Sequence, residues 1–355
     1  MVFVNILLFA FGLIILVKGS DFLVKSAASI SKKLGISEFV VGLTLVALGT
    51  SIPELASAII ASIKMESGLV MGNIVGANIA DIGLVTGLAA AISVIRTNKD
   101  VLKRDGYIML FAALVFYIFM LNKIISRIEA ILLLFLYFAY ILFLYEFESK
   151  VVGGKYHFRQ FMDYFFRFKY VATIRSGLVS GVRVKGKSIK ITDVKEIKEL
   201  FREGLVKDFL IAAVSIVAVI FGANYFVSEA NFFAELLGVP EVIIGVSLMS
   251  IGTTLPELSV TVAAARKGFG YIALGNAIGS SITNILLIIG ISAFIHPLNV
   301  VNFTLYYSAP FMIFMGILLL AFIRSYWRIR RVEGIVFLVL YVLFLASLFF
   351  VSALF

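Results

Sequence analysis

The sequence predicts an all-α polytopic membrane protein with ten transmembrane helices, arranged as two inverted five-helix repeats. Three observations predict this fold: an apolar composition, ten long apolar segments, and a motif that occurs twice at a constant offset. Of the 355 residues, 61% are hydrophobic and only 15% are charged, and the mean hydropathy is +1.08. Soluble domains are about half apolar and about a quarter charged, so an ordinary soluble protein is excluded.

Ten segments are long and apolar enough to cross about 30 Å of hydrocarbon at ~1.5 Å per helical residue. They lie near residues 3–30, 38–63, 69–95, 105–122, 128–147, 209–234, 241–265, 271–296, 304–323 and 333–353. The first segment lacks the basic start and small-residue cleavage site of a signal peptide, so we expect it to remain a membrane span.

A polar stretch divides the chain into a first five-helix repeat (1–147), a loop (148–207) and a second five-helix repeat (208–355). The loop carries 14 Lys or Arg and 6 Asp or Glu. This basic excess predicts that the protein lies in the cell membrane with the loop on the cytoplasmic side and both termini outside. Residues 156–170 mix aromatic and basic side chains, and we expect them to form a tether that lies on the membrane surface. The basic excess therefore indicates membrane orientation, and we expect no nucleic-acid partner.

Two motifs occur in both halves of the chain. They read LVALGTSIPELASAIIA (45–61) with GNIVGANIADIGL (72–84), and LMSIGTTLPELSVTVAA (248–264) with GNAIGSSITNILL (275–287). The first motif region, 45–84, matches the second, 248–287, at an offset of 203 residues without a gap. Because each half has five spans, an odd number, the second half enters the membrane from the opposite side. Inverted repeats of this kind are typical of secondary transporters.

Three carboxylates fall near the centre of apolar spans. They are Glu54, Asp81 and Glu257, and Asn284 occupies the fourth equivalent position. An ionised carboxylate at that depth costs between about 3 and more than 10 kcal/mol unless a cation, a cavity or a partner compensates it. None of these spans has a central Lys or Arg, which disfavours a structural salt bridge and leaves a bound cation or a protonated acid.

Each glutamate follows a proline that can interrupt its helix. Pro53 and Pro256 free a carbonyl about four residues earlier, so carbonyls near Ala47 to Thr50 and near Ser250 to Thr253 can turn toward an ion. Downstream, glycines spaced four apart allow close helix contacts next to Asn73 and Asn276. The two motifs thus bring helix breaks, amides and carboxylates together.

These groups together form the predicted metal site. Its members are Glu54, Glu257, Asp81, Asn284, Thr50, Thr253, Ser51, Thr254, Ser280, Ala47, Ser250, Asn73 and Asn276. All offer hard oxygen ligands, which suit Ca²⁺ and can also bind Na⁺. The chain has no Cys and two His, which excludes thiolate metal sites and an HExxH metalloprotease.

The two motif pairs resemble the repeats of the calcium/cation antiporter superfamily, and most of all those of its prokaryotic sodium/calcium exchangers. The resemblance implies that Glu54 and Glu257 are central Ca²⁺ ligands, alternating with Na⁺. It also implies that Ser51, Thr254 and Ser280 belong to Na⁺ sites, that Thr50 and Thr253 contribute carbonyls and hydroxyls, that Ala47 and Ser250 contribute backbone, and that Asp81 and Asn284 lie at the middle. In the family, the first and sixth spans slide against the rest.

The sequence departs from the family pattern at Ala77, where most relatives have a serine, so one hydroxyl of a Na⁺ site is missing. The acid of the middle pair is Asp81, with Asn284 opposite, whereas some relatives have the acid in the second repeat. Asp21 and Glu229 lie off centre, where an interfacial role is at least as well supported as a place on the ion path.

Four functions are compatible with this pattern. The leading prediction is a Ca²⁺/Na⁺ antiporter, with transported ions, membrane lipid, no cofactor and no obligatory protein partner. A proton-driven Ca²⁺/H⁺ antiporter of the same superfamily is the main alternative, although the extra Glu typical of proton exchangers is absent. An intramembrane acid hydrolase is a remote alternative, and inverted halves without a selectivity-filter sequence fit a carrier better than a channel.

Overall fold

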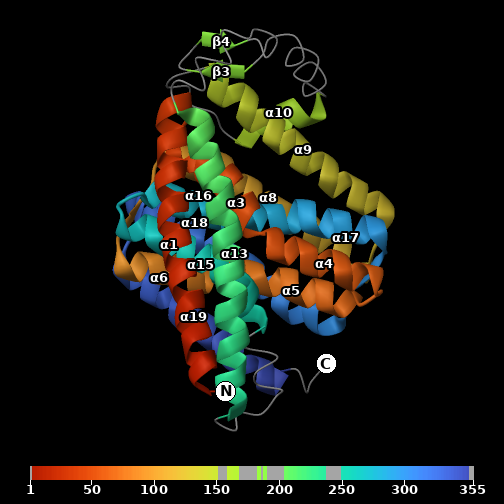
Figure 1. Ribbon diagram of the computed structural model, residues 1–355. Helices are drawn as coiled ribbons and strands as arrows, with labels where there is room; N and C mark the ends of the chain where they lie inside the picture. Colours follow the sequence, from red (N-terminus) through yellow and green to blue (C-terminus); the bar gives the residue numbers. More distant parts are fainter. Residues whose placement is uncertain are drawn as a thin grey trace.

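The computed structural model describes residues 2–150, 158–167, 182–184, 187–189, 204–236 and 249–351. Described residues are mostly helical, and five short π-helical segments, labelled η, interrupt the helices. Figure 1 shows α1 (Val2–Leu34) and α13 (Leu205–Leu236) side by side along the length of the molecule, with the other helices crossing behind them.

From α5 and α16 onward, the elements follow one another in the same order in both halves, except that α7 has no counterpart among the described residues. The first half has α2 (Glu38–Val41), η1 (Gly42–Val46), α3 (Ala47–Thr50), α4 (Ile52–Ile63), α5 (Ser67–Ala80), η2 (Asp81–Thr86), α6 (Gly87–Ile92), β1 (Ile95–Arg96), α7 (Lys99–Val101), η3 (Leu102–Gly106), α8 (Tyr107–Met120), β2 (Ile124–Ile125) and α9 (Arg127–Lys150). After α10 (Phe158–Phe166), β3 (Val182–Val184) and β4 (Lys187–Ile189), the second half has α15 (Met249–Arg266), α16 (Gly270–Ile282), η5 (Thr283–Ile288), α17 (Ile289–Ile295), β5 (Leu298–Asn299), η6 (Thr304–Ser308), α18 (Ala309–Tyr326), β6 (Arg328–Ile329) and α19 (Arg331–Val351).

Seven helices of the described residues are long and apolar enough to cross a membrane, and the bent pair 38–50 and 52–63 would make an eighth span. The other two predicted spans correspond to α8, which follows the charged segment η3, and to α15, which follows the undescribed residues 237–248. The structure is therefore that of a multi-pass membrane protein, and the count of ten stays a prediction.

Two short antiparallel ladders connect the halves crosswise. β1 pairs with β6, and β2 pairs with β5. At the offset of 203 residues, β1 corresponds to β5 and β2 overlaps the position of β6, so the two ladders are equivalent contacts. The π-helical segments follow the same rule, because η2 and η5 begin at equivalent positions to within one residue, as do η3 and η6.

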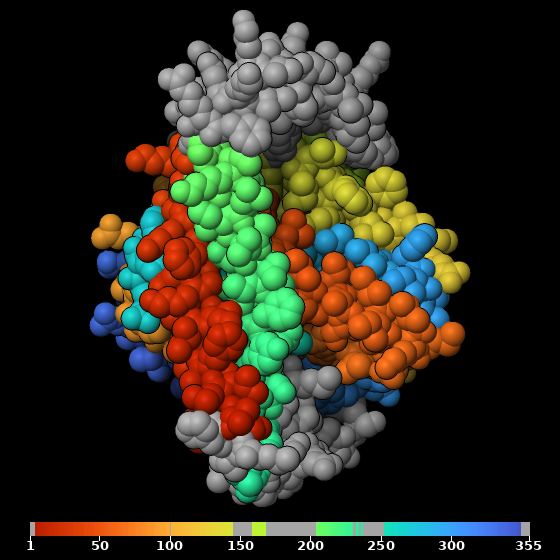
Figure 2. Space-filling view, in the orientation of Figure 1, coloured from red at the N-terminus to blue at the C-terminus, as the bar shows by residue number. Residues whose placement is uncertain are grey.

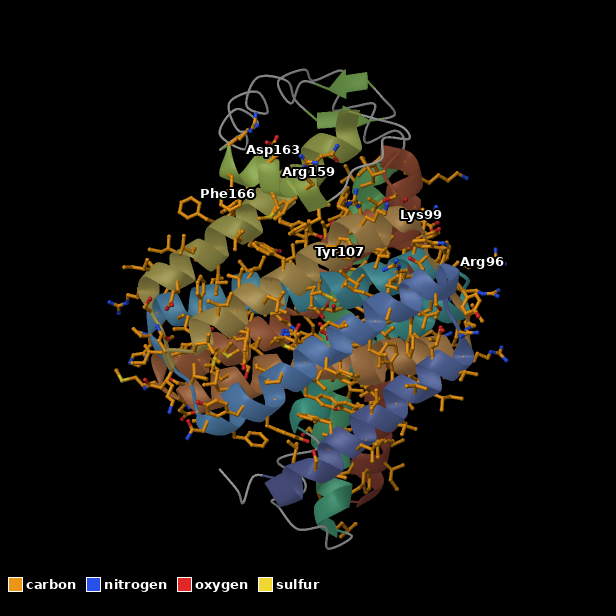
Figure 3. All side chains as sticks on the ribbon, turned by 180° about the vertical axis from the view of Figure 1, so that it is seen from behind. Arg96, Lys99, Tyr107, Arg159, Asp163 and Phe166 are labelled. Atoms are coloured by element: carbon orange, nitrogen blue, oxygen red, sulfur yellow. The ribbon has the colours of Figure 1, made fainter. Side chains whose placement is uncertain are left out.

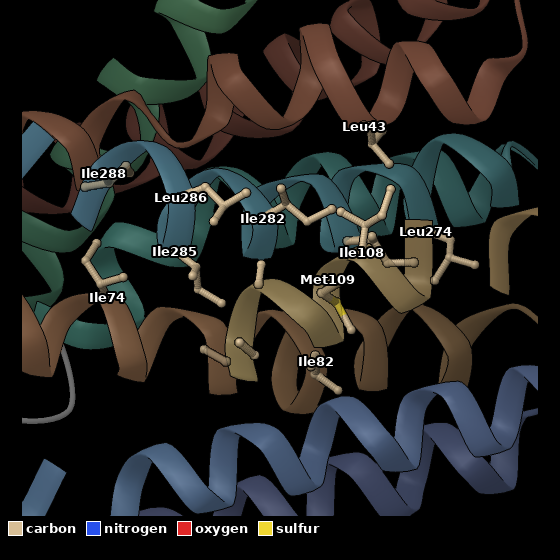
Figure 4. Packing of buried hydrophobic residues seen from close by; sticks show 14 of the residues in the cluster. Leu43, Ile74, Ile82, Ile108, Met109, Leu274, Ile282, Ile285, Leu286 and Ile288 are labelled. Atoms are coloured by element: carbon tan, nitrogen blue, oxygen red, sulfur yellow. The ribbon is translucent and has the colours of Figure 1, made fainter. Parts of the chain in front are cut away.

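Close helix contacts depend on small residues. A Cβ on Gly12 would lie 2.8 Å from the backbone nitrogen of Phe226, so α1 and α13 approach closely. Around the middle of the molecule, α16 packs against α2 and η1, and buried aliphatic side chains such as Leu43, Ile282 and Ile285 fill the space between the helices (Figure 4). This packing holds the two motif regions against each other.

Part of the predicted surface tether is buried. α10 packs against α9, with Phe161 and Tyr164 buried and their rings in contact with Phe143. Figure 3 shows α10 alongside α9, with Arg159 and Phe166 labelled. The aromatic face of α10 thus packs on α9, whereas Arg159 and Phe166 stay exposed, and a position at the membrane surface stays a prediction. Residues 156, 157 and 168–170 lie outside the described residues.

A matched glycine pair tests the close approach of α16. A Cβ on Gly275 would lie 2.4 Å from the carbonyl oxygen of Phe39, whereas a Cβ on the equivalent Gly72 meets nothing within 4 Å. We expect Gly275→Ala to destabilise the protein by about 1–3 kcal/mol because backbone must move. Gly72→Ala should be neutral or slightly stabilising because alanine favours helix. Unfolding in detergent, followed by circular dichroism, measures both, and equal behaviour would contradict the packing.

Candidate ion-binding site

A break in the second predicted span places its polar residues. α3 ends at Thr50, Ser51 has φ −83° and ψ 9°, and α4 begins at Ile52 with a bend of 46°. Pro53 has no N–H, so the carbonyl of Gly49 lacks its usual helical donor. The motif thus exposes backbone and hydroxyl oxygens within one turn of Glu54.

The second copy of the motif does not break in the same way. α15 runs from Met249 to Arg266 as one helix with Pro256 inside it. The expectation of an interrupted helix near Ser250 to Thr253 is therefore wrong for the described residues, because the loss of one hydrogen bond to a proline need not end a helix. Nothing is described of the Ser250 side chain, although its backbone lies in the first turn of α15.

The three carboxylates are fully buried. Glu54, Asp81 and Glu257 are at most 1% exposed, and Asn284 is buried as well. Among the described residues, neither carboxylate oxygen of Asp81 or of Glu54 has a hydrogen-bond partner with good geometry, although the Thr253 hydroxyl lies near enough to stabilise the charge of Glu54. Glu257 accepts one hydrogen bond, from the Ser51 hydroxyl at 3.1 Å, and its other oxygen has no partner there. Hydroxyls therefore compensate these buried charges only in part, and no cationic side chain of the described residues pairs with them.

The carboxylates also lie close enough to repel one another. Glu54 interacts with both Glu257 and Asp81, and Asp81 interacts with Glu257. No ion pair within the described residues involves any of the three. Like charges held together in a low dielectric repel strongly, so the site favours a cation or a proton among them.

Two hydrogen bonds join the halves reciprocally. The Thr50 hydroxyl donates to Oδ1 of Asn276 at 3.3 Å, and the Thr253 hydroxyl donates to Oδ1 of Asn73 at 3.5 Å. Thr253 is the counterpart of Thr50, and Asn276 is the counterpart of Asn73. The same contact is therefore made twice, each time between a residue of one half and a residue of the other.

The remaining predicted ligands occupy the same neighbourhood. The Ser51 hydroxyl, which donates to Glu257, also lies 3.3 Å from the Ser280 hydroxyl, so it is placed between α15 and α16. Thr254 and Ala47 are buried. The Ala47 carbonyl accepts bonds from the Ser51 N–H and, at 3.3 Å, from the Thr50 hydroxyl, so it is engaged within its own helix rather than turned away.

One residue of the site was missed by the sequence analysis. Nδ2 of Asn276 donates to the Thr261 hydroxyl at 2.9 Å, which orients the amide with its oxygen toward Thr50. Thr261 lies one helical turn after Glu257, so the spacing in the sequence already places both residues on the same face of the helix. Its counterpart in the first half is Ala58, and Nδ2 of Asn73 correspondingly has no partner among the described residues.

The arrangement is chemically suited to hard cations. Among the described residues no compact group of three or more His, Cys, Asp or Glu is present, so an ion must take amide, hydroxyl or carbonyl oxygens in addition to carboxylates. Mixed oxygen ligands of this kind suit Ca²⁺ and Na⁺. The site lies between helices of a membrane protein, where such residues mark ion pathways.

Comparison with known proteins gives the family. The sequence model of the sodium/calcium exchanger protein family matches residues 4–146 and 207–350. The chain belongs to the sodium/calcium exchanger family. Sodium/calcium exchanger MaX1 of Methanosarcina acetivorans is 51% identical over 351 residues, which cover 99% of this chain and 100% of that protein. The putative antiporter CaxA of Alkalimonas amylolytica is 26% identical and covers 93% of this chain and 94% of that protein.

A solved exchanger has the same fold. The sodium-calcium exchanger NCX_Mj, soaked with 10 mM Na⁺ and zero Ca²⁺, matches with a TM-score of 0.74 at 29% identity, over 98% of this chain and 100% of that one. The exchanger family transports Ca²⁺ and Na⁺ without a cofactor, and the chain is a membrane cation antiporter rather than an enzyme. The hydrolase alternative is therefore wrong.

The buried charges predict an unusual response to substitution. In ion-free detergent solution, we expect Glu54→Gln to unfold at a higher temperature than the unmodified exchanger, because the amide removes repulsion among buried carboxylates. Added Ca²⁺ should raise the unfolding temperature of the unmodified chain. The rise should be much smaller for the variant. The exposed Glu66 provides the control, and Glu66→Gln should change neither value. A destabilised, Ca²⁺-responsive Glu54→Gln variant would contradict this account.

Proposed function

We propose that the chain is a secondary active antiporter that exchanges Ca²⁺ for Na⁺ by alternating access through the site between Glu54, Asp81 and Glu257. One observation carries the proposal: these carboxylates are buried close enough to repel one another, and no cationic side chain of the described residues pairs with them. A carrier needs such a site, because the charge must be compensated by whichever ion is bound. Support also comes from the relatives, two of which are described as sodium/calcium exchangers.

The proposed topology is ten spans in two inverted repeats, 1–147 and 208–355, with a cytoplasmic loop at 148–207 and both termini outside. The crosswise ladders support it, because a twofold axis in the membrane plane turns the β1–β6 contact into the β2–β5 contact. The basic composition of the loop supports its cytoplasmic side. The reciprocal threonine and asparagine contacts across the site support the same symmetry.

In this exchanger Glu54 and Glu257 are the central Ca²⁺ ligands. Thr50 and Thr253 add carbonyl or hydroxyl oxygens, and Asp81 with Asn284 completes the middle of the site. The Na⁺ sites use Ser51, Thr254 and Ser280, the backbone of Ala47 and Ser250 contributes carbonyls, and Asn73 and Asn276 hold the threonines in position. Buried hydroxyls and amides close to the carboxylates support these roles.

Charge balance explains how one site takes unlike ions. Up to three negative charges can be neutralised by one Ca²⁺ together with a proton, or by about three Na⁺. Both loaded forms then leave little net charge at the centre of the membrane, whereas the empty site stays strongly negative. Movement of the site between the two sides is therefore favoured when it is loaded, which couples the two ion fluxes.

The moving part is proposed to be α1 together with α13. These helices pack along each other with glycine contacts on both sides, since a Cβ on Gly222 would lie 2.5 Å from the backbone nitrogen of Leu16. Such close packing favours motion of the two helices as one unit. A shear of this unit along the remaining helices would expose the site alternately to the two sides.

Coupling to protons is the second candidate. Ala77 is buried and lacks the hydroxyl that Ser280 provides at the equivalent position, which removes one Na⁺ ligand. The unpartnered carboxylates can bind protons instead, so a Ca²⁺/H⁺ antiporter would use the same centre.

A transport assay separates the two couplings. In proteoliposomes loaded with Na⁺, we expect Ca²⁺ uptake that follows the Na⁺ gradient and ignores an imposed pH gradient. Glu257→Gln should lower uptake by at least about tenfold, since a hydrogen bond or contact to a charged ligand is worth ~1.5–3 kcal/mol. Glu66→Gln should transport normally. Uptake that follows pH and ignores Na⁺ would support the proton-driven antiporter, and the absence of any uptake would refute exchange.

A single substitution tests the departure at Ala77. Ala77→Ser restores a hydroxyl at the position equivalent to Ser280, and we expect it to lower the Na⁺ concentration needed for half-maximal exchange by a few fold. Ala80→Ser serves as the control, because Ala80 is equally buried and lies on the same helix outside the proposed ligand set. The Na⁺ dependence of Ca²⁺ flux measures both variants, and an unchanged Na⁺ dependence in Ala77→Ser would remove this position from the Na⁺ site.

A further inference from the structure

A groove separate from the ion site runs between α1 and α15. Its cavity volume is about 560 Å³, which is within the range of small-molecule sites. In Figure 1, α15 passes behind α1, and the two helices are in contact. The groove wall is mostly aliphatic, with Leu13, Leu16 and Val17 from α1 and Leu258 and Val262 from α15.

The groove is reachable from the lipid-facing side of α1. Leu13 is 41% exposed and Val17 is 44% exposed, although both line the cavity. Figure 2 shows α1 uncovered along one face of the molecule, beside α13. In a membrane protein this surface faces acyl chains, so the natural occupant of an apolar hollow here is a chain of a lipid.

One end of the groove is charged. Asp21, Arg266 and Lys267 all line it, and Nζ of Lys267 lies 2.5 Å from Oδ1 of Asp21. That pair compensates itself, whereas Arg266 is exposed and forms no ion pair within the described residues. Lys18 and Lys25, three residues before and four residues after Asp21 on α1, add positive charge nearby.

This charge pattern argues for one class of ligand. An apolar wall offers no oxygen to a cation, and an uncompensated guanidinium at its end repels one, so the groove is unsuited to the transported ions. A guanidinium binds phosphate oxygens well, often through two parallel hydrogen bonds. We propose that the groove binds an anionic phospholipid, with one acyl chain between α1 and α15 and its phosphate at Arg266.

None of the residues that line the groove belongs to the proposed ion-binding set. The Ser259 hydroxyl, which also lines the groove, is already hydrogen bonded to Ser20 at 2.5 Å and so ties α15 to α1 beneath the lipid chain. A lipid bound there would contact the α1 and α13 unit and the rest of the protein at once. Binding is independent of which ion drives exchange, and it can be measured without transport.

Native mass spectrometry of the full chain in detergent tests the proposal. Palmitoyl-oleoyl phosphatidylglycerol or the matching phosphatidylcholine is added, and the lipid retained by the protein is counted. We expect preferential retention of phosphatidylglycerol, and a loss of about fivefold in its apparent affinity for Arg266→Gln. Arg266→Lys should keep part of that affinity, and Arg324→Gln, at an exposed arginine on α18, should keep all of it.

A second variant tests the acyl-chain groove itself. Val17→Trp fills the hollow and should weaken phosphatidylglycerol retention, whereas Leu114→Trp, on α8 and 43% exposed, should not. Unfolding temperatures establish that each variant is folded. The proposal is overturned if Arg266→Gln and Arg324→Gln retain lipid equally, if Val17→Trp retains lipid like Leu114→Trp, or if the unmodified protein retains both lipids equally.

Discussion

The burial of carboxylates without protein counter-charges is the constraint on which the site depends. Glu54 and Asp81 have no hydrogen-bond partner with good geometry for their oxygens in the described structure, and only one oxygen of Glu257 has one. Another buried acid is paired: Asp105 is fully buried and contacts both Arg104, at 2.8 Å, and the Tyr140 hydroxyl, at 3.1 Å. The contrast shows that this chain can compensate a buried carboxylate with its own side chains. In the proposed exchanger, a bound cation supplies that compensation at the centre of the molecule.

Neither half of the chain can build this centre alone. Thr50 needs Asn276, and Thr253 needs Asn73, while the Ser51 hydroxyl reaches across to Glu257. The duplication therefore produces a shared site rather than two separate ones. Sequence differences between the halves then make its two ends chemically unlike, as where Thr261 orients one asparagine and the other has no equivalent donor or acceptor. In the proposed exchanger, that asymmetry is what allows the ends of one site to prefer different ions.

The membrane fold and the duplicated site could be predicted from the sequence. Hydrophobic composition indicates membrane insertion, and a repeat without gaps indicates duplication. The burial of Glu54, Asp81 and Glu257 followed from their position in apolar segments, and the structure confirms it. The helix break was predicted in both halves but occurs in one, since proline permits a break and tertiary packing decides whether it forms. The burial of Phe161 and Tyr164 in α10 was not predicted. A helix that packs on another helix and a helix that packs on the membrane surface have the same mixture of aromatic and basic residues.

The contacts of α1 indicate where the structure can move. On the side of α13, glycines let the two backbones come into contact. On the side of α15, there is a cavity of about 560 Å³. Two contacts join α1 to α15 there: the hydrogen bond between Ser20 and Ser259 and the ion pair between Asp21 and Lys267. Both residues of that ion pair are partly exposed, and ion pairs at exposed positions contribute at most about 1 kcal/mol. The proposed sliding of α1 against α15 would break this ion pair and the Ser20–Ser259 hydrogen bond, whereas separation of α1 from α13 would open a close-packed interface. The proposed phospholipid would lie at this interface, so the cavity that would ease the proposed movement would also hold a ligand able to influence it.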